Sequence, residues 1–250
     1  MTTFSTAPRE YQVRISELRR LTPDIMLVRV VSADPAVSFG FESGAWMQWR
    51  IPAAEGIVKR CFSVASSAAE HSFLEFIIRR TPSGPGTRWL FEDAAVGTEF
   101  TIWGGAGNFR LKNAEAPAVM IAGGSGLSAI RSLLLTLADQ GNTGKPVTLF
   151  FGAVNRTNLY LTEELEALRE RLPRLTFIPV LSAPEAADQW NGATGLVTEA
   201  VDQWCKDGNP AEEAYLCGSP GMLDACLTVL TGNGIAKDRI YFDKFVSPPK

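Results

Sequence analysis

The stretch VMIAGGSGLSAIRSLLLTLA, residues 119–138, decides the fold of the second half of this chain. A short apolar run passes through Gly123, Gly124 and Gly126 into a pattern with helical periodicity. Glycines at a strand-to-helix turn let backbone N–H groups approach a phosphate, and the helix N-terminus presents about half a positive charge to it. This layout favours a phosphate site. A glycine turn that only closes a strand–helix unit is the structural alternative.

Strand and helix patterns alternate after this stretch. The short apolar runs PVTLFFGA, LTFIPVLSA and AEEAYLCG have the composition of strands buried on both faces. In LTEELEALRERL, residues 161–172, the leucines recur at three- and four-residue steps, as on one face of a helix. We therefore expect an α/β doubly wound parallel sheet.

The first half of the chain follows another pattern. Short runs rich in Val, Ile, Phe and Trp are separated by turns with Gly and Pro, and helical periodicity is almost absent. Regularly spaced short strands predict an antiparallel sandwich or a small barrel. The polar stretch LKNAEAP, residues 111–117, ends in proline. It places the boundary between an N-terminal domain, 1–112, and a C-terminal domain, 113–250.

Composition and charge exclude several classes of protein. The net charge is −3 over 250 residues and there is no dense run of Lys and Arg, so we expect no nucleic-acid partner. No apolar window approaches the roughly 20 residues that a membrane-spanning helix needs, and MTTFSTAPRE lacks the layout of a signal peptide. The expectation is a cytoplasmic protein with no membrane partner.

The four cysteines argue against a metal centre on this chain. Cys61, Cys205, Cys217 and Cys226 form no C-x-x-C pair, and His71 is the only histidine. This spacing fits neither a structural zinc site nor a disulfide framework, and it lacks the run that holds a plant-type iron–sulfur cluster. We expect no metal here and any iron–sulfur centre on another chain.

A second candidate site lies in VKRCFSVASS, residues 58–67. Arg60 falls in a strand-like run, where a buried arginine is costly unless it faces an anion. One interpretation is a salt bridge. The carboxylates considered for it are Glu42, Glu55 and Glu75. The other interpretation is a phosphate, with Phe62 as a stacking face for a planar ring and Ser63 as a hydrogen-bond partner at the edge of that ring.

Two more glycine turns accompany these motifs. In FIIRRTPSGPGTRWL, residues 76–90, a strand leads through a Gly-rich turn into Thr87 and a helix-like start. CGSPGM, residues 217–222, follows an apolar strand of the parallel half, so it should open onto the same crevice as GGSG. Cys217 either is a buried small hydrophobe or lines a pocket. A barrel and a nucleotide fold, each with an anion site, indicate two nucleotides that meet.

Taken in order, these motifs resemble the ferredoxin-NADP reductase superfamily over nearly the whole chain. The resemblance is closest to the FAD/NAD portion of reductase components of bacterial oxygenases, such as soluble methane monooxygenase reductase. RCFS is similar to the R-x-Y-S motif of the family, GPGT to its flavin-phosphate turn, GGSG to G-G-T-G and CGSPGM to C-G-P-P-x-M. YFDKF, residues 241–245, resembles the close of oxygenase reductases. The resemblance implies a six-stranded antiparallel β-barrel that binds flavin, followed by the α/β NAD domain.

The resemblance also implies roles for residues. Ser63 would approach flavin N5, Cys217 would pack beside the nicotinamide, and Asp243 would handle a proton or stabilise a radical. For Asp243 an exposed strand-end carboxylate is the structural alternative. The implied cofactor-binding residues are Arg60, Cys61, Phe62, Ser63, Ile78, Arg79, Gly84, Gly86, Thr87, Gly123, Gly124, Ser125, Gly126, Cys217, Gly218, Ser219, Met222 and Phe245. Phe62 stands where the family has tyrosine, and Ser219 where it has proline.

The implied activity is that of an NADH-dependent FAD oxidoreductase, an electron-transfer reductase component. It would take hydride from NADH onto FAD and pass single electrons to an iron–sulfur or oxygenase partner. The expected partners are a separate or excised [2Fe-2S] ferredoxin and an oxygenase hydroxylase component. The motifs leave FMN open as the flavin. The missing ferredoxin domain is the main departure from many of these reductases.

NADH is expected because VLSAPE, residues 180–185, lacks the Ser-Arg that NADPH-using relatives carry at this point, and Arg156 is the cation that could reverse this choice. Two alternatives to the reductase function stay open. One is an NADH:flavin reductase that releases reduced flavin. The other is a nucleotide-responsive binding subunit without turnover.

Overall fold

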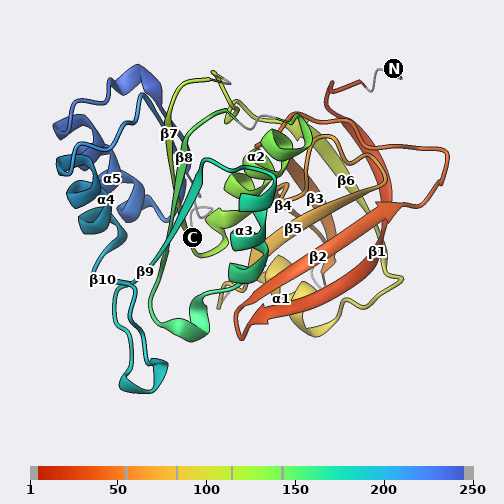
Figure 1. Ribbon diagram of the computed structural model, residues 1–250. Helices are drawn as coiled ribbons and strands as arrows, with labels where there is room; N and C mark the ends of the chain where they lie inside the picture. Colours follow the sequence, from red (N-terminus) through yellow and green to blue (C-terminus); the bar gives the residue numbers. More distant parts are fainter. Residues whose placement is uncertain (1–4, 54–55, 83, 114, 142–143, 245–250) are drawn as a thin grey trace. The chain divides into compact units, whose positions relative to one another are not determined.

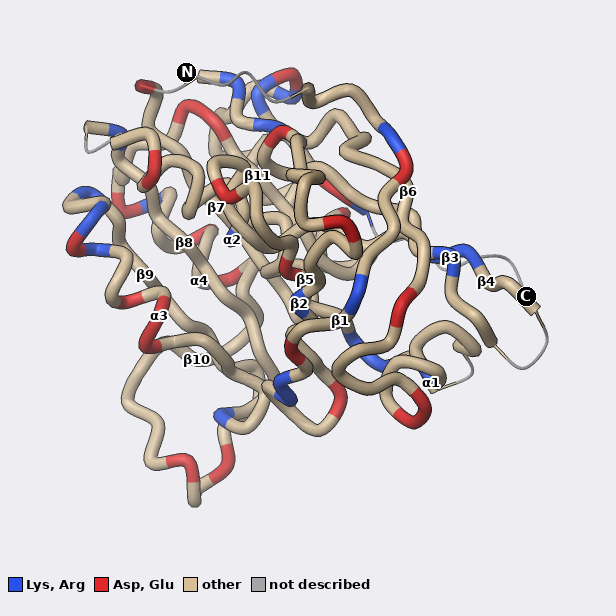
Figure 2. Tube along the Cα trace, turned by 90° about the vertical axis from the view of Figure 1, so that its right-hand side faces the viewer, with Lys and Arg blue, Asp and Glu red and all other residues tan. Residues whose placement is uncertain are grey.

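The computed structural model describes residues 5–53, 56–82, 84–113, 115–141 and 144–244. The chain forms two compact units. The first runs to Arg110 and also takes in Arg131–Thr136, and the second takes in Leu111–Ile130 and the chain from Leu137 onward. Lys and Arg residues are interspersed with Asp and Glu residues along the described chain (Figure 2).

The first unit is built on a six-stranded antiparallel sheet (Figure 1). Its strands are β1 (Arg9–Thr22), β2 (Ile25–Ser32), β3 (Trp46–Ala53), β4 (Gly56–Ser63), β5 (Phe73–Arg79) and β6 (Glu99–Ala106), in the order β4-β3-β6-β1-β2-β5. Val64, directly after β4, forms an antiparallel bridge with Phe76 of β5, so the two edges of the sheet meet. The sheet therefore curls into the barrel that was expected.

Alternation along the strands gives the barrel its core. In β1, Tyr11, Val13 and Ile15 are buried and their neighbours are exposed, which is the period of two expected for a strand with one face inward. Trp49 of β3 is fully buried, and its ring centroid lies 5.0 Å from that of Phe76 in an edge contact. Helix α1 (Pro85–Glu92) lies between β5 and β6 in the chain.

The second unit is built on a six-stranded parallel sheet with strand order β10-β9-β8-β7-β11-β12. The strands are β7 (Ala118–Gly123), β8 (Val147–Ala153), β9 (Leu175–Leu181), β10 (Ala193–Thr194), β11 (Glu213–Gly218) and β12 (Ile240–Lys244). Every residue of β11 is buried, as expected for a central strand covered on both faces. The doubly wound parallel sheet is thus confirmed.

Helices connect these strands. They are α2 (Leu127–Asp139), α3 (Thr162–Ala167), α4 (Val197–Lys206) and α5 (Pro220–Gly232). The 3₁₀ turns are η1 (Gly124–Gly126), η2 (Arg156–Asn158), η3 (Leu168–Glu170), η4 (Ala186–Asp188) and η5 (Lys237–Arg239). In the leucine-rich stretch at 161–172 the α-helix ends at Ala167 and tightens into η3. None of the helices in the described ranges is long and apolar enough to cross a membrane.

A buried polar cluster holds the start of the second unit. The Lys145 ammonium donates hydrogen bonds of 2.6 Å to the carbonyl oxygens of Asn113 and Ala116, and it lies 3.6 Å from a carboxylate oxygen of Glu213. Tyr215 donates its hydroxyl to that same oxygen at 2.8 Å. Burial lowers the pKa of Lys145 and raises the pKa of Tyr215. The cluster lies at the amino ends of the strands, so their carboxyl ends are left for ligands.

Candidate active site

In the first unit, Arg60 and the start of α1 lie together. A Cβ added to Gly86 would sit 2.9 Å from the Ile51 Cδ1 atom and 3.1 Å from Cγ of Arg60. Gly86, in the first turn of α1, therefore packs against the aliphatic stem of Arg60, and a side chain there would push the arginine away. A guanidinium beside a helix N-terminus offers both a cation and backbone N–H donors, which fits a phosphate.

Thr87 closes the turn in front of α1. Its buried hydroxyl accepts a 3.0 Å hydrogen bond from the backbone N–H of Thr81, and the two threonine hydroxyls lie 2.9 Å apart. Gly84 is the N-cap and Pro85 takes the first helical position, where a missing N–H costs nothing. The hydroxyl of Thr87 thus shapes the turn. The backbone N–H groups of Gly86 and Thr87, at the start of α1, have no partner within the helix and suit an anion.

Two of the three carboxylates considered as partners for Arg60 are engaged by other arginines. Glu42 forms an ion pair with Arg110. Glu75 forms ion pairs with Arg29 and Arg131. Glu55 lies outside the described residues. The Arg60 guanidinium donates a 2.8 Å hydrogen bond to the carbonyl oxygen of its neighbour Lys59. With Glu42 and Glu75 engaged elsewhere, we keep the phosphate interpretation of Arg60.

Phe62 lies on the same strand as Arg60, and Trp49 supports its ring. The ring centroids of Phe62 and Trp49 are 5.1 Å apart with planes at 78°, an edge contact that fixes the orientation of the half-buried Phe62 ring. Ser63 is buried at the end of β4. Because side chains alternate along a strand, Cys61 lies on the opposite face of β4 from Arg60 and Phe62. Contact of Cys61 with a flavin on that face would use its backbone.

Ile78 and Arg79 end β5. The Ile78 side chain is buried in the core of the barrel, so its contribution to a binding site would come from its backbone. Arg79 is exposed, and its Nε lies 2.7 Å from a carboxylate oxygen of Asp24. The nearest atoms to a Cβ on Gly86 belong to Ile51, Arg60 and Val58, and not to Ile78 or Arg79.

In the second unit the two glycine turns lie side by side. Strands β7 and β11 pair in parallel with Ala122 opposite Cys217, so GGSG and CGSPGM follow neighbouring strand ends. A Cβ on Gly126 would project into the carbonyl group of Cys217. The thioether of Met222 fills the space beside both Gly123 and Gly218, where a Cβ on Gly123 would lie 2.5 Å from the sulfur. The expectation that both turns open at one edge of the sheet agrees with this geometry.

Tyr160 holds the first of these turns, and sequence reasoning missed it. Its buried hydroxyl donates a 2.7 Å hydrogen bond to the carbonyl oxygen of Gly124. Gly124 has a φ of 52°, in the left-handed region where glycine is favoured. The Tyr160 ring packs edge-on against Phe151 at 5.2 Å. Tyr160, which is 36 residues from Gly124 in the chain, therefore holds the turn that carries Ser125.

Ser219 and Cys217 have separate roles in the second turn. The hydroxyl of Ser219 accepts a 3.4 Å hydrogen bond from the backbone N–H of Met222, so the serine that replaces the family proline caps α5. Cys217 is fully buried and lies opposite Asp243 of β12. Burial, followed by the charge of Asp243, raises the pKa of the Cys217 thiol well above its ordinary value. The Cys217 thiol therefore stays protonated at neutral pH. Phe245 lies outside the described residues.

Arg156 is held by an acidic loop at the end of β9. Its backbone N–H donates to a carboxylate oxygen of Asp188 at 3.2 Å, and its guanidinium donates to the Asp188 carbonyl oxygen at 2.9 Å. Beside it, the Asn155 amide donates to a carboxylate oxygen of Glu185 at 3.1 Å. Two carboxylates of the loop after β9 therefore lie close to Arg156, which follows β8.

The regions of the chain that contain these sites match known protein families. Residues 12–111 match the family described as an oxidoreductase FAD-binding domain, and residues 120–228 match an oxidoreductase NAD-binding domain. The chain is 34% identical over 240 residues to the phenol hydroxylase P5 protein of Acinetobacter pittii, which covers 96% of this chain and 66% of that protein. It is also 34% identical over 243 residues to the xylene/toluene monooxygenase electron transfer component XylA of Pseudomonas putida, covering 97% and 67% of the two chains. The chain thus spans about two thirds of the length of these curated relatives.

A solved structure shows the same fold. The Amycolatopsis cytochrome P450 reductase GcoB superposes with a TM-score of 0.84 at 27% identity, covering 95% of this chain and 70% of that one. The two family matches together take in RCFS, the turn at Gly86, and both glycine turns of the parallel sheet. The chain therefore belongs to the ferredoxin-NADP reductase-like family of FAD- and NAD-binding oxidoreductases, in which the reductase components of bacterial oxygenases are found.

Proposed function

We propose that this protein takes hydride from NADH onto FAD and passes single electrons to an iron–sulfur or oxygenase partner. The observation that carries the proposal is that one chain holds two anion cradles, one where Gly86 packs on Arg60 and one where Gly126 packs on the Cys217 carbonyl. In this proposal residues 1–112 form the flavin domain and residues 113–250 the nicotinamide nucleotide domain.

Each cradle has a defined task. Bound FAD supplies a carrier that accepts two electrons as hydride and returns them singly. Arg60 and the first turn of α1 would hold its diphosphate, and Phe62 would stack on its ring. Ser63 would hydrogen-bond at the reactive edge of that ring. The residues assigned to the nicotinamide nucleotide are Gly123, Gly124, Ser125, Gly126, Cys217, Gly218, Ser219 and Met222.

The choice of NADH rests on the loop around Arg156. A 2′-phosphate needs a cation in surroundings without negative charge. Here the Asp188 carboxylate accepts from the backbone N–H of Arg156, and the Glu185 carboxylate accepts from Asn155. These two carboxylates carry the same sign of charge as a 2′-phosphate and therefore disfavour its binding. Steady-state kcat/KM for NADH should therefore exceed that for NADPH, and a ratio below one would reverse the choice.

The partners and the cellular location belong to the proposal as well. The relatives are named for phenol hydroxylase and xylene/toluene monooxygenase, which supports an oxygenase hydroxylase component as an electron acceptor. A [2Fe-2S] ferredoxin, separate or excised, is the other acceptor that we propose. A cytoplasmic location is proposed from the cysteine spacing, which indicates no disulfide framework.

An anaerobic titration tests the function. The purified protein should be yellow, carry FAD rather than FMN when the released flavin is chromatographed, and bleach with one equivalent of NADH. Flavin that stays with the protein during gel filtration supports the electron-transfer role, whereas flavin that separates on reduction would identify an NADH:flavin reductase. A protein that binds flavin but does not oxidise NADH with any artificial acceptor would be a binding subunit. A protein that stays colourless with added FAD would end the proposal.

A further inference from the structure

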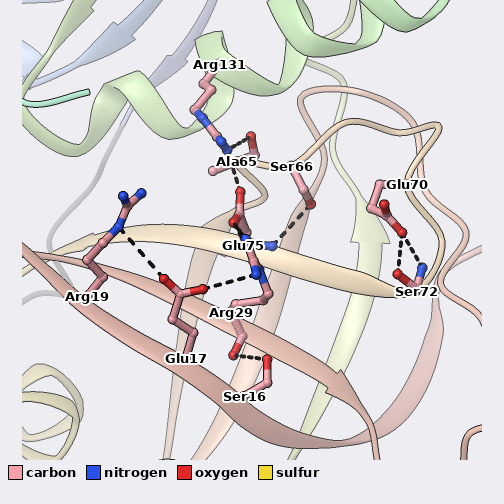
Figure 3. Close-up of polar contacts among 10 residues, drawn as sticks. All are labelled: Ser16, Glu17, Arg19, Arg29, Ala65, Ser66, Glu70, Ser72, Glu75 and Arg131. Carbon is pink, nitrogen blue, oxygen red and sulfur yellow. Dashed lines mark hydrogen bonds and ion pairs between the residues drawn. The ribbon is translucent and has the colours of Figure 1, made fainter. Parts of the chain in front are cut away.

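Glu75 is a buried carboxylate of the first unit that takes no part in the two cradles. It lies on β5, and each of its oxygens meets an arginine at 2.7 Å, Arg29 on one side and Arg131 on the other (Figure 3). The side chains of Glu75 and Arg131 are 5% and 7% exposed, whereas that of Arg29 is 37% exposed and also pairs with Glu17. A buried ion pair is weak evidence for stability, because desolvation opposes the attraction. Stability alone therefore does not account for this buried ion pair.

The same guanidinium nitrogen of Arg131 reaches the segment that follows RCFS. It donates a 2.8 Å hydrogen bond to the carbonyl oxygen of Ala65, two residues after Ser63. The Ala65 N–H donates to the Glu75 carbonyl oxygen at 2.7 Å, and the Glu75 N–H donates to the Ser66 hydroxyl at 3.2 Å. Figure 3 shows Glu75 between Arg131 and Arg29, with Ala65 beside the Arg131 guanidinium. The chain directly after Ser63 is thus fixed by Glu75 and Arg131.

Arg131 is also tied to the GGSG turn through the chain. It lies on α2, which begins at Leu127 directly after the GGSG turn. Because Arg131 belongs to the first compact unit, its contacts with Glu75 and Ala65 are internal to that unit. Within the first unit, the Arg131 guanidinium therefore holds the segment that follows Ser63 by its hydrogen bond to the Ala65 carbonyl oxygen.

We propose that Glu75 and Arg131 are positioning residues for hydride transfer. Glu75 holds the Arg131 guanidinium on the Ala65 carbonyl, and this bond fixes the end of β4 so that Ser63 keeps its place at the reactive edge of the flavin. The inference rests on the proposed function. A misplacement of about 1 Å can cost 100-fold in rate, so the pair should act on the rate of hydride transfer more than on cofactor affinity.

The main test replaces Arg131→Met, which keeps the stem and removes the donor to Ala65. Anaerobic stopped-flow mixing with NADH should show flavin reduction slowed by about 10- to 100-fold. The Kd for FAD should change by less than about threefold. Arg131→Lys should recover part of the rate, because an ammonium can still donate to the Ala65 carbonyl but lacks the planar fork.

A double variant guards against misfolding. Removing one partner of a buried pair is strongly destabilising, but replacing both by apolar groups is often neutral. Glu75→Leu with Arg131→Met should therefore fold and still reduce flavin slowly. In its flavin-free form, the amide of Ala65 should exchange hydrogen faster than in the wild type. This readout tests the positioning contact without turnover.

Arg171→Met is the matched control. Arg171 pairs with Asp139 at the exposed end of the same helix, so its loss removes an arginine–carboxylate pair of α2 without touching Ala65. It should leave the reduction rate and the Ala65 exchange unchanged. The inference is overturned if folded, flavin-loaded Arg131 and double variants are reduced as fast as the wild type, or if their loss is entirely one of FAD binding. Failure of the proposed function looks different, because the wild-type flavin itself would not bleach with NADH.

Discussion

The backbone carbonyl of Cys217 occupies the space into which a Cβ on Gly126 would project. Both partners of this contact are buried, and the obstructing atoms are backbone, so relief requires the two turns to move apart. The close approach explains why a glycine stands at this point, and it gives the first prediction.

Gly126→Ala should separate the two turns and weaken nicotinamide nucleotide binding by at least about tenfold, while overpacking costs about 1–3 kcal/mol of stability. Calorimetric titration with NAD measures the first effect and thermal unfolding the second. Gly221→Ala is the control, because nothing lies within 4 Å of its added Cβ in α5, and it should stabilise slightly. Equal nucleotide affinity in both variants would contradict the assignment of the turn.

Arg60→Met should weaken FAD binding by roughly 10- to 150-fold, because hydrogen bonds to charged groups contribute about 1.5–3 kcal/mol each. Flavin fluorescence quenching measures the Kd. Arg50→Met removes an arginine of the neighbouring strand that pairs with Glu10, and it should leave FAD affinity within about twofold. If both variants bind FAD like the wild type, Arg60 does not hold the diphosphate.

The buried Cys217 should resist alkylation at pH 8, because its raised pKa leaves a negligible thiolate fraction and the thiolate is the reactive form. Cys61 is exposed and should react first. Peptide mass mapping after iodoacetamide treatment distinguishes the two. The rate of NADH oxidation should show no ionisation of the Cys217 thiol between about pH 6 and 9. Labelling of Cys217 in the folded protein would disprove its burial.

Lys145 should make stability rise with pH in the alkaline range. Burial lowers its folded pKa below the ordinary value of 10.5, so between those two values the unfolded chain binds more protons than the folded chain. The free energy of unfolding therefore increases with pH across that window. Lys145→Met should abolish this rise and cost about 3–5 kcal/mol, since Glu213 stays buried without its cation. Lys206→Met, at an exposed pair with Asp202, should cost less than about 1 kcal/mol. Denaturant unfolding at several pH values measures both.

The sequence predicted the fold and the glycine turns because these features have local signals. Alternation along β1 reflects one covered face, and the short apolar run AYLC in β11 reflects two covered faces. A glycine turn between strand and helix is visible in a few letters. The order of the strands, and the closure of the barrel through Val64 and Phe76, have no such local signal. The strand pattern alone is compatible with a sandwich or a barrel, and the family resemblance predicted the barrel.

The contacts that sequence reasoning missed are long-range. Tyr160 and Gly124 are 36 residues apart, and Arg131 and Glu75 are 56 residues apart. A hydroxyl that bonds a carbonyl, or an arginine that meets one glutamate among many, leaves no periodic pattern to read. Glu75 was considered as a partner for Arg60, and the structure gives it to Arg29 and Arg131 instead.

The placement of Arg131 in the first compact unit has a consequence for exchanging parts between related reductases. A chimera joined at residue 112 would carry Glu75 from one parent and the residue at 131 from the other. If the second parent lacks an arginine there, the hybrid inherits a buried carboxylate with only the half-exposed Arg29 to neutralise it. Sequence alone would divide the chain at residue 112, but the first compact unit also includes six residues from the middle of α2, Arg131–Thr136. A functional exchange would have to transfer these six residues together with the chain up to Arg110.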